Sequence, residues 1–193
     1  MALAFVASGC DQGTVTEEEE SGFRDTQLGS SIAAFCGKYD GATVNIRTAN
    51  RIDGDQQYVV ADALAATEVR TPVFAFSAAE IEVERAQRRA QWRVVCEDGT
   101  LGFANVEFQT WLSVGAGNDE NVYQTRYGVP AGKQLPQEAG ARWSPFNNSQ
   151  LEKWILRADL NQKFMWADDQ DVEVAADPGC RAHVFEVVTT ATG

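Results

Sequence analysis

Short apolar segments of four to seven residues alternate with polar turn sequences along most of the chain. The segments are rich in Val, Ile, Phe and Trp, and the turns between them contain Gly, Asp and Asn. This pattern is typical of β-strands joined by tight turns. EDGT at 97–100 places Asp-Gly between two apolar runs, which indicates a hairpin. Helical periodicity is nearly absent, so the pattern predicts an all-β protein.

The segments repeat in three units of about 50 residues. Gln56, Gln109 and Gln162 are spaced 53 residues apart, and each precedes an aromatic residue by two positions. Four apolar segments per unit give twelve expected strands: 43–49, around Tyr58, 67–70 and 92–95; 100–106, around Trp111, 121–125 and 143–146; 153–158, around Phe164, 171–176 and 183–188.

One segment departs from the strand pattern. Residues 77–91, SAAEIEVERAQRRAQ, place Ser77 and Glu80 at capping-box spacing, and Glu84 and Arg88 form an i, i+4 pair. EIEVE within the segment alternates like a strand, but the capping and charge signals favour a short helical insertion in the first unit.

Three such units predict a β-trefoil. One unit cannot bury its own apolar face, whereas three around a pseudo-threefold axis close a barrel, cap one end with hairpins and leave no open sheet edge. We expect the domain to span 32–190, with repeats at about 40–95, 96–146 and 147–190.

The arrangement resembles the fascin-like β-trefoil group. Tyr58-Val59, Trp111-Leu112 and Phe164-Met165 match its aromatic-apolar pair, and Trp92, Trp143 and Phe185 match its closing strands. The group's usual Gly-Lys before the aromatic is replaced here by Gln57, Thr110 and Lys163. Its relatives bundle actin, but no actin-contact motif is identifiable in this chain. Gln109-Thr110-Trp111 also matches the Gln-x-Trp signature of ricin-type lectins, at a different place in the repeat, and we interpret that match as coincidence.

The recurrent aromatic is expected to be structural. Tyr58, Trp111 and Phe164 would stack in one symmetric core layer, and the preceding glutamines would satisfy backbone groups in turns. A role as sugar-stacking platforms is the alternative.

The first residues resemble a bacterial lipoprotein signal. Leu3–Val6 is apolar and leads into Ala7-Ser8-Gly9-Cys10, so residues 1–10 would form a signal-like segment with Cys10 as the lipidated residue. The alternative is a frayed terminus with an incidental cysteine. Residues 11–31 are polar and acidic, a composition that predicts a disordered tether. Together they predict a protein of the bacterial cell envelope, lipid-anchored or extracellular.

The net charge of −12 argues against nucleic-acid partners, because their phosphates must be neutralised by Lys and Arg. It disfavours anionic membrane surfaces for the same reason, which leaves a lipid anchor as the expected contact with a membrane. The simplest interpretation of the acidity is that it keeps the protein soluble.

No catalytic constellation is recognisable. His183 is the single histidine and lies in an apolar closing segment, and the chain has no Gly-x-Ser-x-Gly elbow or phosphate-binding loop. The acidic turns at 53–55 and 168–171 could hold calcium, but a solvated turn is favoured. We therefore expect a non-enzyme without metal or cofactor.

The four cysteines are Cys10, Cys36, Cys96 and Cys180. Closure of a trefoil brings its chain ends together, which favours a Cys36–Cys180 disulfide. Cys36 and Cys96 lie at matching places of two repeats, and a barrel should separate such places.

Ligand-binding candidates are residues that break the threefold pattern. Trp154 and Trp166 are tryptophans of the third unit that symmetry does not require, and Asp168 and Asp169 follow Trp166. Arg85, Arg88 and Arg89 would share a helix face that could dock an acidic partner or an anionic glycan, or could balance Glu80, Glu82 and Glu84. The favoured function is binding of a glycan by a monomeric module; a protein-interaction role, as protease inhibitor or envelope adaptor working through 115–121 and 128–142, is the alternative.

Overall fold

The computed structural model describes residues 25–52, 54–65, 67–82, 84–127, 134–148, 153–168, 170–176 and 184–190. Predictions for Cys10, Asp169, Cys180 and His183 lie outside this range, as does the side chain of Arg85. None of the helices in the described part is long and apolar enough to cross a membrane.

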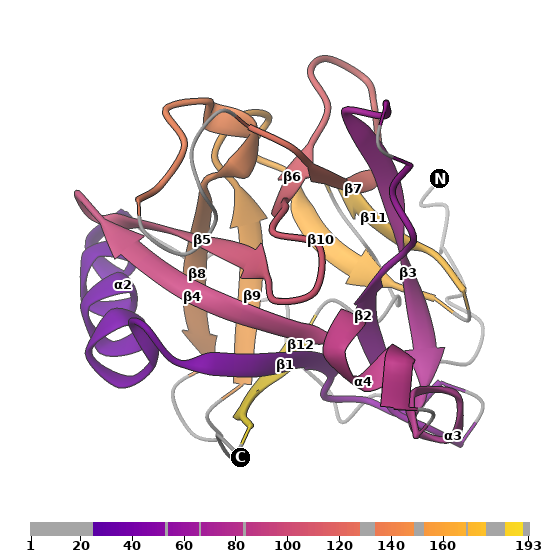
Figure 1. Cartoon of the computed structure of the whole chain (residues 1–193). Coiled ribbons are helices and arrows are strands. Elements are labelled where there is room, and N and C mark those ends of the chain that lie inside the picture. Colours follow the sequence, from indigo (N-terminus) through magenta and orange to yellow (C-terminus); the bar gives the residue numbers. More distant parts are fainter. Residues whose placement is uncertain are drawn as a thin grey trace, which may run out of the picture.

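Six strands form a closed antiparallel ring. Each pairs with two others, in the order β1, β4, β5, β8, β9, β12 and back to β1. This ring is the barrel visible in Figure 1. The strands are β1 (Thr43–Thr48), β4 (Gln91–Glu97), β5 (Thr100–Asn105), β8 (Trp143–Asn148), β9 (Lys153–Ala158) and β12 (Val184–Thr189).

Three hairpins extend from the ring and meet at one end of it (Figure 1). Strands β3 and β7 pair over Arg70–Pro72, and isolated bridges join Phe74 to Asp171 and Asn121 to Glu173. The hairpins are β2 (Gln57–Ala61) with β3 (Arg70–Ser77), β6 (Trp111–Val114) with β7 (Val122–Thr125), and β10 (Phe164–Ala167) with β11 (Val172–Ala175).

The chain is thus a β-trefoil of three four-strand repeats, as the sequence predicts. Its repeats occupy β1–β4, β5–β8 and β9–β12, close to the expected limits. The third strand of the first repeat begins at Arg70, where the expected 67–70 segment ends. The strand therefore continues through Pro72, a residue that sequence reasoning places at strand ends or edges.

In each repeat the residue that faces the core is the one that follows the aromatic predicted to be there. Val59, Leu112 and Met165 are almost fully buried in the main core cluster. Their neighbours Tyr58 and Phe164 are only half-buried, and Trp111 belongs to a separate small cluster. The predicted common layer of three aromatics is therefore wrong: successive side chains of a strand face opposite sides, and here the second member of each pair faces inward.

The closing strands contribute their aromatics to the centre as expected. Trp92, Trp143 and Phe185 are fully buried. Trp92 Nε1 donates to the carbonyl of Val59 at 2.9 Å, and Trp143 Nε1 donates to that of Leu112 at 3.1 Å. These equivalent bonds satisfy the indole N–H groups that burial would otherwise leave unpaired, and they fix the closing strand to the hairpin in two repeats.

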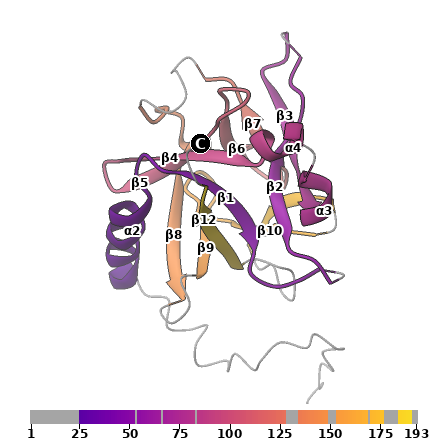
Figure 2. The same ribbon diagram turned by 60° about the horizontal axis from the view of Figure 1, so that its bottom comes forward.

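Helix α2 (Asp25–Tyr39) begins inside the segment predicted to be a disordered tether, so the prediction is wrong for residues 25–31. It lies against the barrel end away from the hairpins (Figures 1 and 2). Phe35 and Tyr39 are one helical turn apart and almost fully buried. The Phe35 ring packs edge-on against Trp154 and Phe103, with centroids 4.8 and 6.2 Å apart. The helix therefore closes the open end of the barrel.

The disulfide joins Cys36 of α2 to Cys96 of β4, with Cα atoms 5.9 Å apart. The predicted Cys36–Cys180 bridge is wrong. Cys36 lies in the closing helix and not in the first repeat, so the separation of equivalent places by the barrel does not apply to it.

The helical insertion is confirmed. It forms α3 (Ala78–Ile81) and α4 (Glu84–Arg89) between β3 and β4. The Glu80 carboxylate accepts from the backbone N–H and the hydroxyl of Ser77 at 2.7 and 2.8 Å, which is the start signal read from the sequence. A short 3-10 turn, η1 (Ala139–Ala141), occupies the corresponding connection of the second repeat.

Candidate functional site

The two tryptophans proposed as ligand contacts are not available at the surface. Trp154 is 3% exposed and Trp166 is 4% exposed. Trp154 is covered by Phe35 and Tyr39 of α2, a helix that sequence reasoning missed. Asp168 is exposed in a turn closed by its N–H bonding to the carbonyl of Asp171. The candidates of the third repeat therefore do not form a binding surface together.

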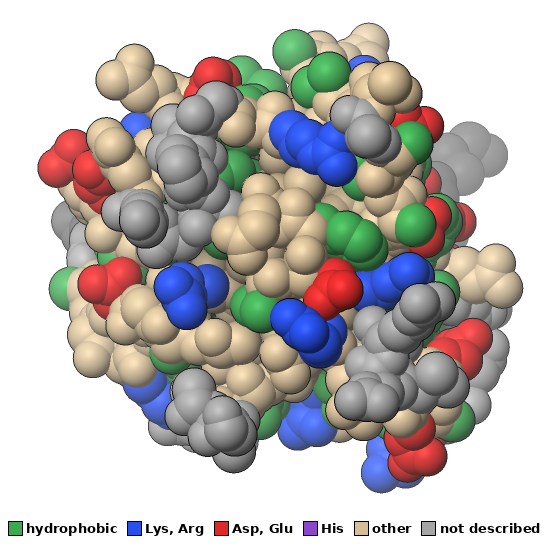
Figure 3. All heavy atoms as spheres, viewed as in Figure 1, with side chains coloured by type: hydrophobic (Ala, Val, Ile, Leu, Met, Phe, Trp, Pro, Cys, Tyr) green, Lys and Arg blue, Asp and Glu red, His purple; other side chains and the backbone are tan. Residues whose placement is uncertain are grey.

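The arginine cluster is matched by acids other than those expected. Arg88 Nε lies 3.0 Å from a carboxylate oxygen of Glu107, and Arg89 Nη1 lies 3.9 Å from Asp62. The Arg89 guanidinium also lies over the Phe108 ring. Basic side chains stand apart on the face shown in Figure 3 and do not form one continuous patch. Arg88 and Arg89 thus each lie beside an acid, and the anion-docking face stays a prediction because the side chain of Arg85 lies outside the described residues.

The recurrent glutamines satisfy turn carbonyls, as the sequence predicts. Gln109 Nε2 donates to the carbonyl of Val106, and Gln162 Nε2 donates to that of Asp159. Gln56 Nε2 reaches the carbonyl of Thr48 at 3.0 Å. Gln109 and Gln162 adopt left-handed backbone angles, with φ of 54° and 58°. The glutamine thus stabilises a tight turn that sets the direction of the following strand.

The aromatic after each glutamine has the same register in all repeats. Tyr58 pairs with Arg47, Trp111 with Ala104 and Phe164 with Arg157. Each ring lies on the face of its hairpin away from the main core, and its surroundings then differ between the repeats.

In the second repeat the position is filled. Trp111 is fully buried together with Leu135 and Ala141 from the β7–β8 connection. In the third repeat Phe164 contacts the ring of Phe146, with centroids 6.2 Å apart. In the first repeat the insertion α3–α4 replaces that cover, and beneath it Tyr58 lines a hollow.

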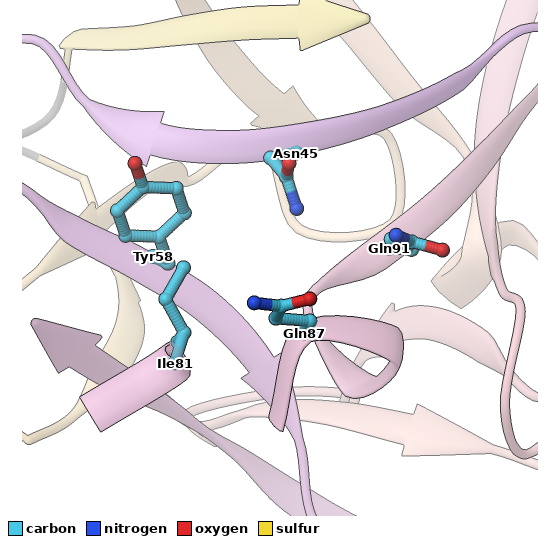
Figure 4. A pocket seen from close by; sticks show the side chains of 5 residues that line it. All are labelled: Asn45, Tyr58, Ile81, Gln87 and Gln91. Atoms are coloured by element: carbon cyan, nitrogen blue, oxygen red, sulfur yellow. The ribbon is translucent and has the colours of Figure 1, made fainter. Parts of the chain in front are cut away.

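This hollow, the Tyr58 hollow, has a volume of about 230 Å³. Figure 4 shows its five side chains surrounding one space, with contributions from β1, β2, α3, α4 and β4. Tyr58 provides an aromatic ring and Ile81 an aliphatic edge, and the other three lining side chains are amides. The lining residues are Asn45, Tyr58, Ile81, Gln87 and Gln91.

The ion pair of Arg47 and Glu186 holds the Tyr58 hydroxyl in place. Arg47 Nη1 donates to the Tyr58 hydroxyl at 3.3 Å, and its Nη2 lies 2.8 Å from Glu186. Gln56 Nε2 donates to the same Glu186 carboxylate at 3.2 Å. Burial alone would lower the pKa of Arg47, but its hydrogen bonds to Tyr58 and Glu186 outweigh that effect and raise the pKa. Arg47 therefore stays charged and its contacts fix the tilt of the ring.

The amides are held to different degrees. Asn45 Nδ2 donates to the carbonyl of Ala90 at 2.9 Å, and this hydrogen bond fixes the Asn45 amide. Gln87 Nε2 makes a longer contact of 3.3 Å with the carbonyl of Glu82. Each amide carries both donor and acceptor atoms, so the hollow can bind hydroxyl groups in either sense. No group of three or more metal-binding side chains exists among the described residues.

Sequence reasoning missed four of the five lining residues. Tyr58 carried a signal in the repeated glutamine-aromatic motif, although it lies outside the core layer that the motif predicted. Asn45, Ile81, Gln87 and Gln91 carried none, because only the folding of the insertion back onto β2 brings them together.

No protein-family model matches the chain, and no curated protein matches its sequence. Solved structures match the fold. The designed threefold-symmetric protein ThreeFoil is 16% identical with a TM-score of 0.57, covering 78% of this chain and all of that one. The BEL β-trefoil is 7% identical with a TM-score of 0.57, covering 78% and 94%. SeviL bound to asialo-GM1 saccharide is 8% identical with a TM-score of 0.53, covering 77% and 98%. At these identities the likeness establishes the β-trefoil fold alone.

Proposed function

We propose that this chain is a non-catalytic carbohydrate-binding module. The observation that carries the proposal is the Tyr58 hollow, whose lining combines an aromatic ring with three amide side chains. A sugar ring presents an apolar C–H face and hydroxyls that both donate and accept. Aromatic rings provide a large apolar surface and amides match hydroxyls in both senses. The structural neighbour SeviL, in complex with a saccharide, supports the same ligand class.

Binding without turnover fits the chemistry of the hollow. Its lining has no carboxylate, histidine, thiol or lysine, and the Tyr58 hydroxyl accepts a hydrogen bond from a permanently charged arginine. Of the side-chain types that serve in general acid–base catalysis, the lining holds only Tyr58.

We place the module outside the cytoplasm. The Cys36–Cys96 disulfide is typical of oxidising compartments, and lipidation at Cys10 would anchor the chain to the cell envelope. Metabolic labelling with a clickable palmitate analogue tests the anchor: wild type should be labelled and Cys10→Ser should not, and equal labelling of both would contradict it.

The function is tested with a glycan array followed by titration calorimetry on the full chain. We expect micromolar to millimolar binding of at least one glycan, weakened at least tenfold in Tyr58→Ala and unchanged in Phe164→Leu, the matched control in the third repeat. An array without any bound glycan contradicts the proposal. If no glycan binds and a pull-down captures a protein partner that requires 115–121 or 128–142, the protein-interaction role takes its place.

A further inference from the structure

We infer that the Tyr58 hollow binds one uncharged pyranose ring and discriminates against sugar acids such as uronates and sialic acid. This inference rests on the proposed function and narrows its ligand class. It follows from three independent properties of the hollow: its size, the charge balance around it and the origin of its amides.

The size selects a single ring. A volume of about 230 Å³ lies below the ~300–1,000 Å³ of sites that enclose drug-sized ligands. Tyr58 is half-buried and Gln87 is exposed, so the hollow is shallow and one side of it is open. A terminal sugar can therefore enter while the remainder of a glycan stays in solvent.

The charge balance disfavours an anion. Three bases described near the hollow lie beside acids: Arg47 lies 2.8 Å from Glu186, Arg88 lies 3.0 Å from Glu107, and Arg89 lies within 4 Å of Asp62. Arg93, two residues along β4 from Gln91, is exposed and is not among the lining residues. None of the five lining side chains is a cation, so a carboxylate entering the hollow would lose part of its hydration without gaining a charged partner in the lining, which is unfavourable. The net charge of −12 adds long-range repulsion.

The insertion contributes one of the three amides, Gln87, whereas Asn45 comes from β1 and Gln91 from β4. Asn45 is fixed by the carbonyl of Ala90, and Ile81 and Gln87 enter from α3 and α4. Hydroxyl groups at the ring edge can bond to Gln87 and Gln91 while the C–H face lies on Tyr58. We therefore expect Gln87 to decide between a hydroxymethyl group and a carboxylate in that region.

The experiment compares neutral sugars with acids of the same ring. Methyl glycosides of glucose, galactose, mannose and N-acetylglucosamine are titrated beside glucuronate, galacturonate and N-acetylneuraminate, at 50 and 500 mM NaCl. We expect at least one neutral sugar to bind with 1:1 stoichiometry, its uronate to bind about tenfold or more weakly at 50 mM NaCl, and the neutral affinity to change less than twofold with salt. A uronate or sialate that binds as tightly as every neutral sugar overturns the inference and leaves carbohydrate binding intact.

Variants locate the site and its selectivity. Tyr58→Ala should weaken the neutral sugar at least tenfold and Gln87→Ala about three- to tenfold. Gln87→Lys should strengthen uronate binding, so that the preference for the neutral sugar over its uronate falls at least fivefold. This gain in uronate affinity should disappear at 500 mM NaCl. Phe164→Leu, outside the hollow, should change neither affinity. Loss of binding in Phe164→Leu with Tyr58→Ala unaffected overturns this site assignment, whereas absence of any sugar binding in wild type overturns the proposed function itself.

Discussion

Asp119 is the centre of a polar network on the β6–β7 hairpin. Its carboxylate accepts from the Tyr123 hydroxyl at 3.0 Å and from the backbone N–H of Asn121 at 3.2 Å, and Arg70 lies 3.8 Å away. Gly115 allows this approach, because a Cβ there would lie 2.1 Å from Asp119 Oδ2. Burial alone would raise the pKa of Asp119, but the hydrogen bonds and the Arg70 charge outweigh it and lower the pKa.

The network gives a pH-dependent contribution to stability. A carboxyl group whose pKa is lowered by folding stabilises the fold above its unfolded pKa of about 3.9, and this stabilisation is lost as the pH falls through the folded value. We expect Asp119→Asn to lower the free energy of unfolding by about 1 kcal/mol at pH 7, with the difference from wild type shrinking below pH 4. Urea unfolding at pH 7 and pH 3 measures it. Tyr123→Phe should show part of the same pH dependence, and an equal loss at both pH values would contradict the assignment.

The alternation of residues along a strand predicts that neighbouring side chains lie on opposite faces, but not which of the two faces lies toward the core. The alternation of Tyr58 and Val59 requires opposite orientations, and both residues are apolar enough for a core. The larger ring suggested the core, but the barrel centre accommodates Val59, Leu112 and Met165 beside the large closing aromatics Trp92 and Trp143. Packing volume decides this question, and it is a property of the assembled barrel that no single repeat contains.

Helix α2 is the element that departs most from what the sequence predicted. Its apolar residues Leu28, Ile32, Phe35 and Tyr39 recur at helical spacing, but the acidic, Gly- and Ser-containing composition of residues 11–31 favoured a tether. Its stability comes from the barrel end it covers, where both rings contact Trp154. Tertiary packing supplies most helical stability in proteins, which explains why the composition alone suggested a tether.

The packing of α2 is tested by shortening one side chain. Phe35→Ala should lower the free energy of unfolding by about 3–5 kcal/mol, because Phe35 is fully buried in the main core and its removal leaves a cavity. Ala34→Ser, at an exposed neighbouring position, should change it by less than about 0.5 kcal/mol. Urea midpoints measure both. Equal stability of wild type and Phe35→Ala would show that α2 does not close the barrel.

Eleven of the twelve strands and the insertion could be predicted because their signals are local: alternation, turn residues and a capping box. The exception is β3, expected at 67–70 and found at Arg70–Ser77. The Tyr58 hollow could not be predicted, because its lining side chains come from positions as far apart as Asn45 and Gln91 and depend on how α3 and α4 lie on β2. Trp154 and Trp166 failed as candidates for a related reason: departure from symmetry indicates a special position, but that position can be a packing contact, as Trp154 beneath α2 shows.

At the scale of the whole molecule, the Cys36–Cys96 bond links the closing helix to the barrel ring. It spans 60 residues of sequence and therefore restricts the unfolded chain across the entire first repeat. Cys36 and Cys96 also line a second hollow of about 350 Å³ between α2 and the β4–β5 turn, which gives a small reductant access to the bond.

Removal of this bond should weaken the fold without changing it. The loop-closure estimate for a loop of this length is roughly 4 kcal/mol, so Cys36→Ala/Cys96→Ala in a Cys10→Ser/Cys180→Ser background should lower the free energy of unfolding by about that amount. Reduction of the background protein with dithiothreitol should give a similar loss, and the oxidised background is the control. Far-ultraviolet circular dichroism at 25 °C should stay unchanged, because Phe35 and Tyr39 still fill the barrel end. A loss below about 1 kcal/mol by both routes would show that the barrel holds α2 without the covalent link, and a loss of the β-sheet spectrum would show that ring closure depends on it.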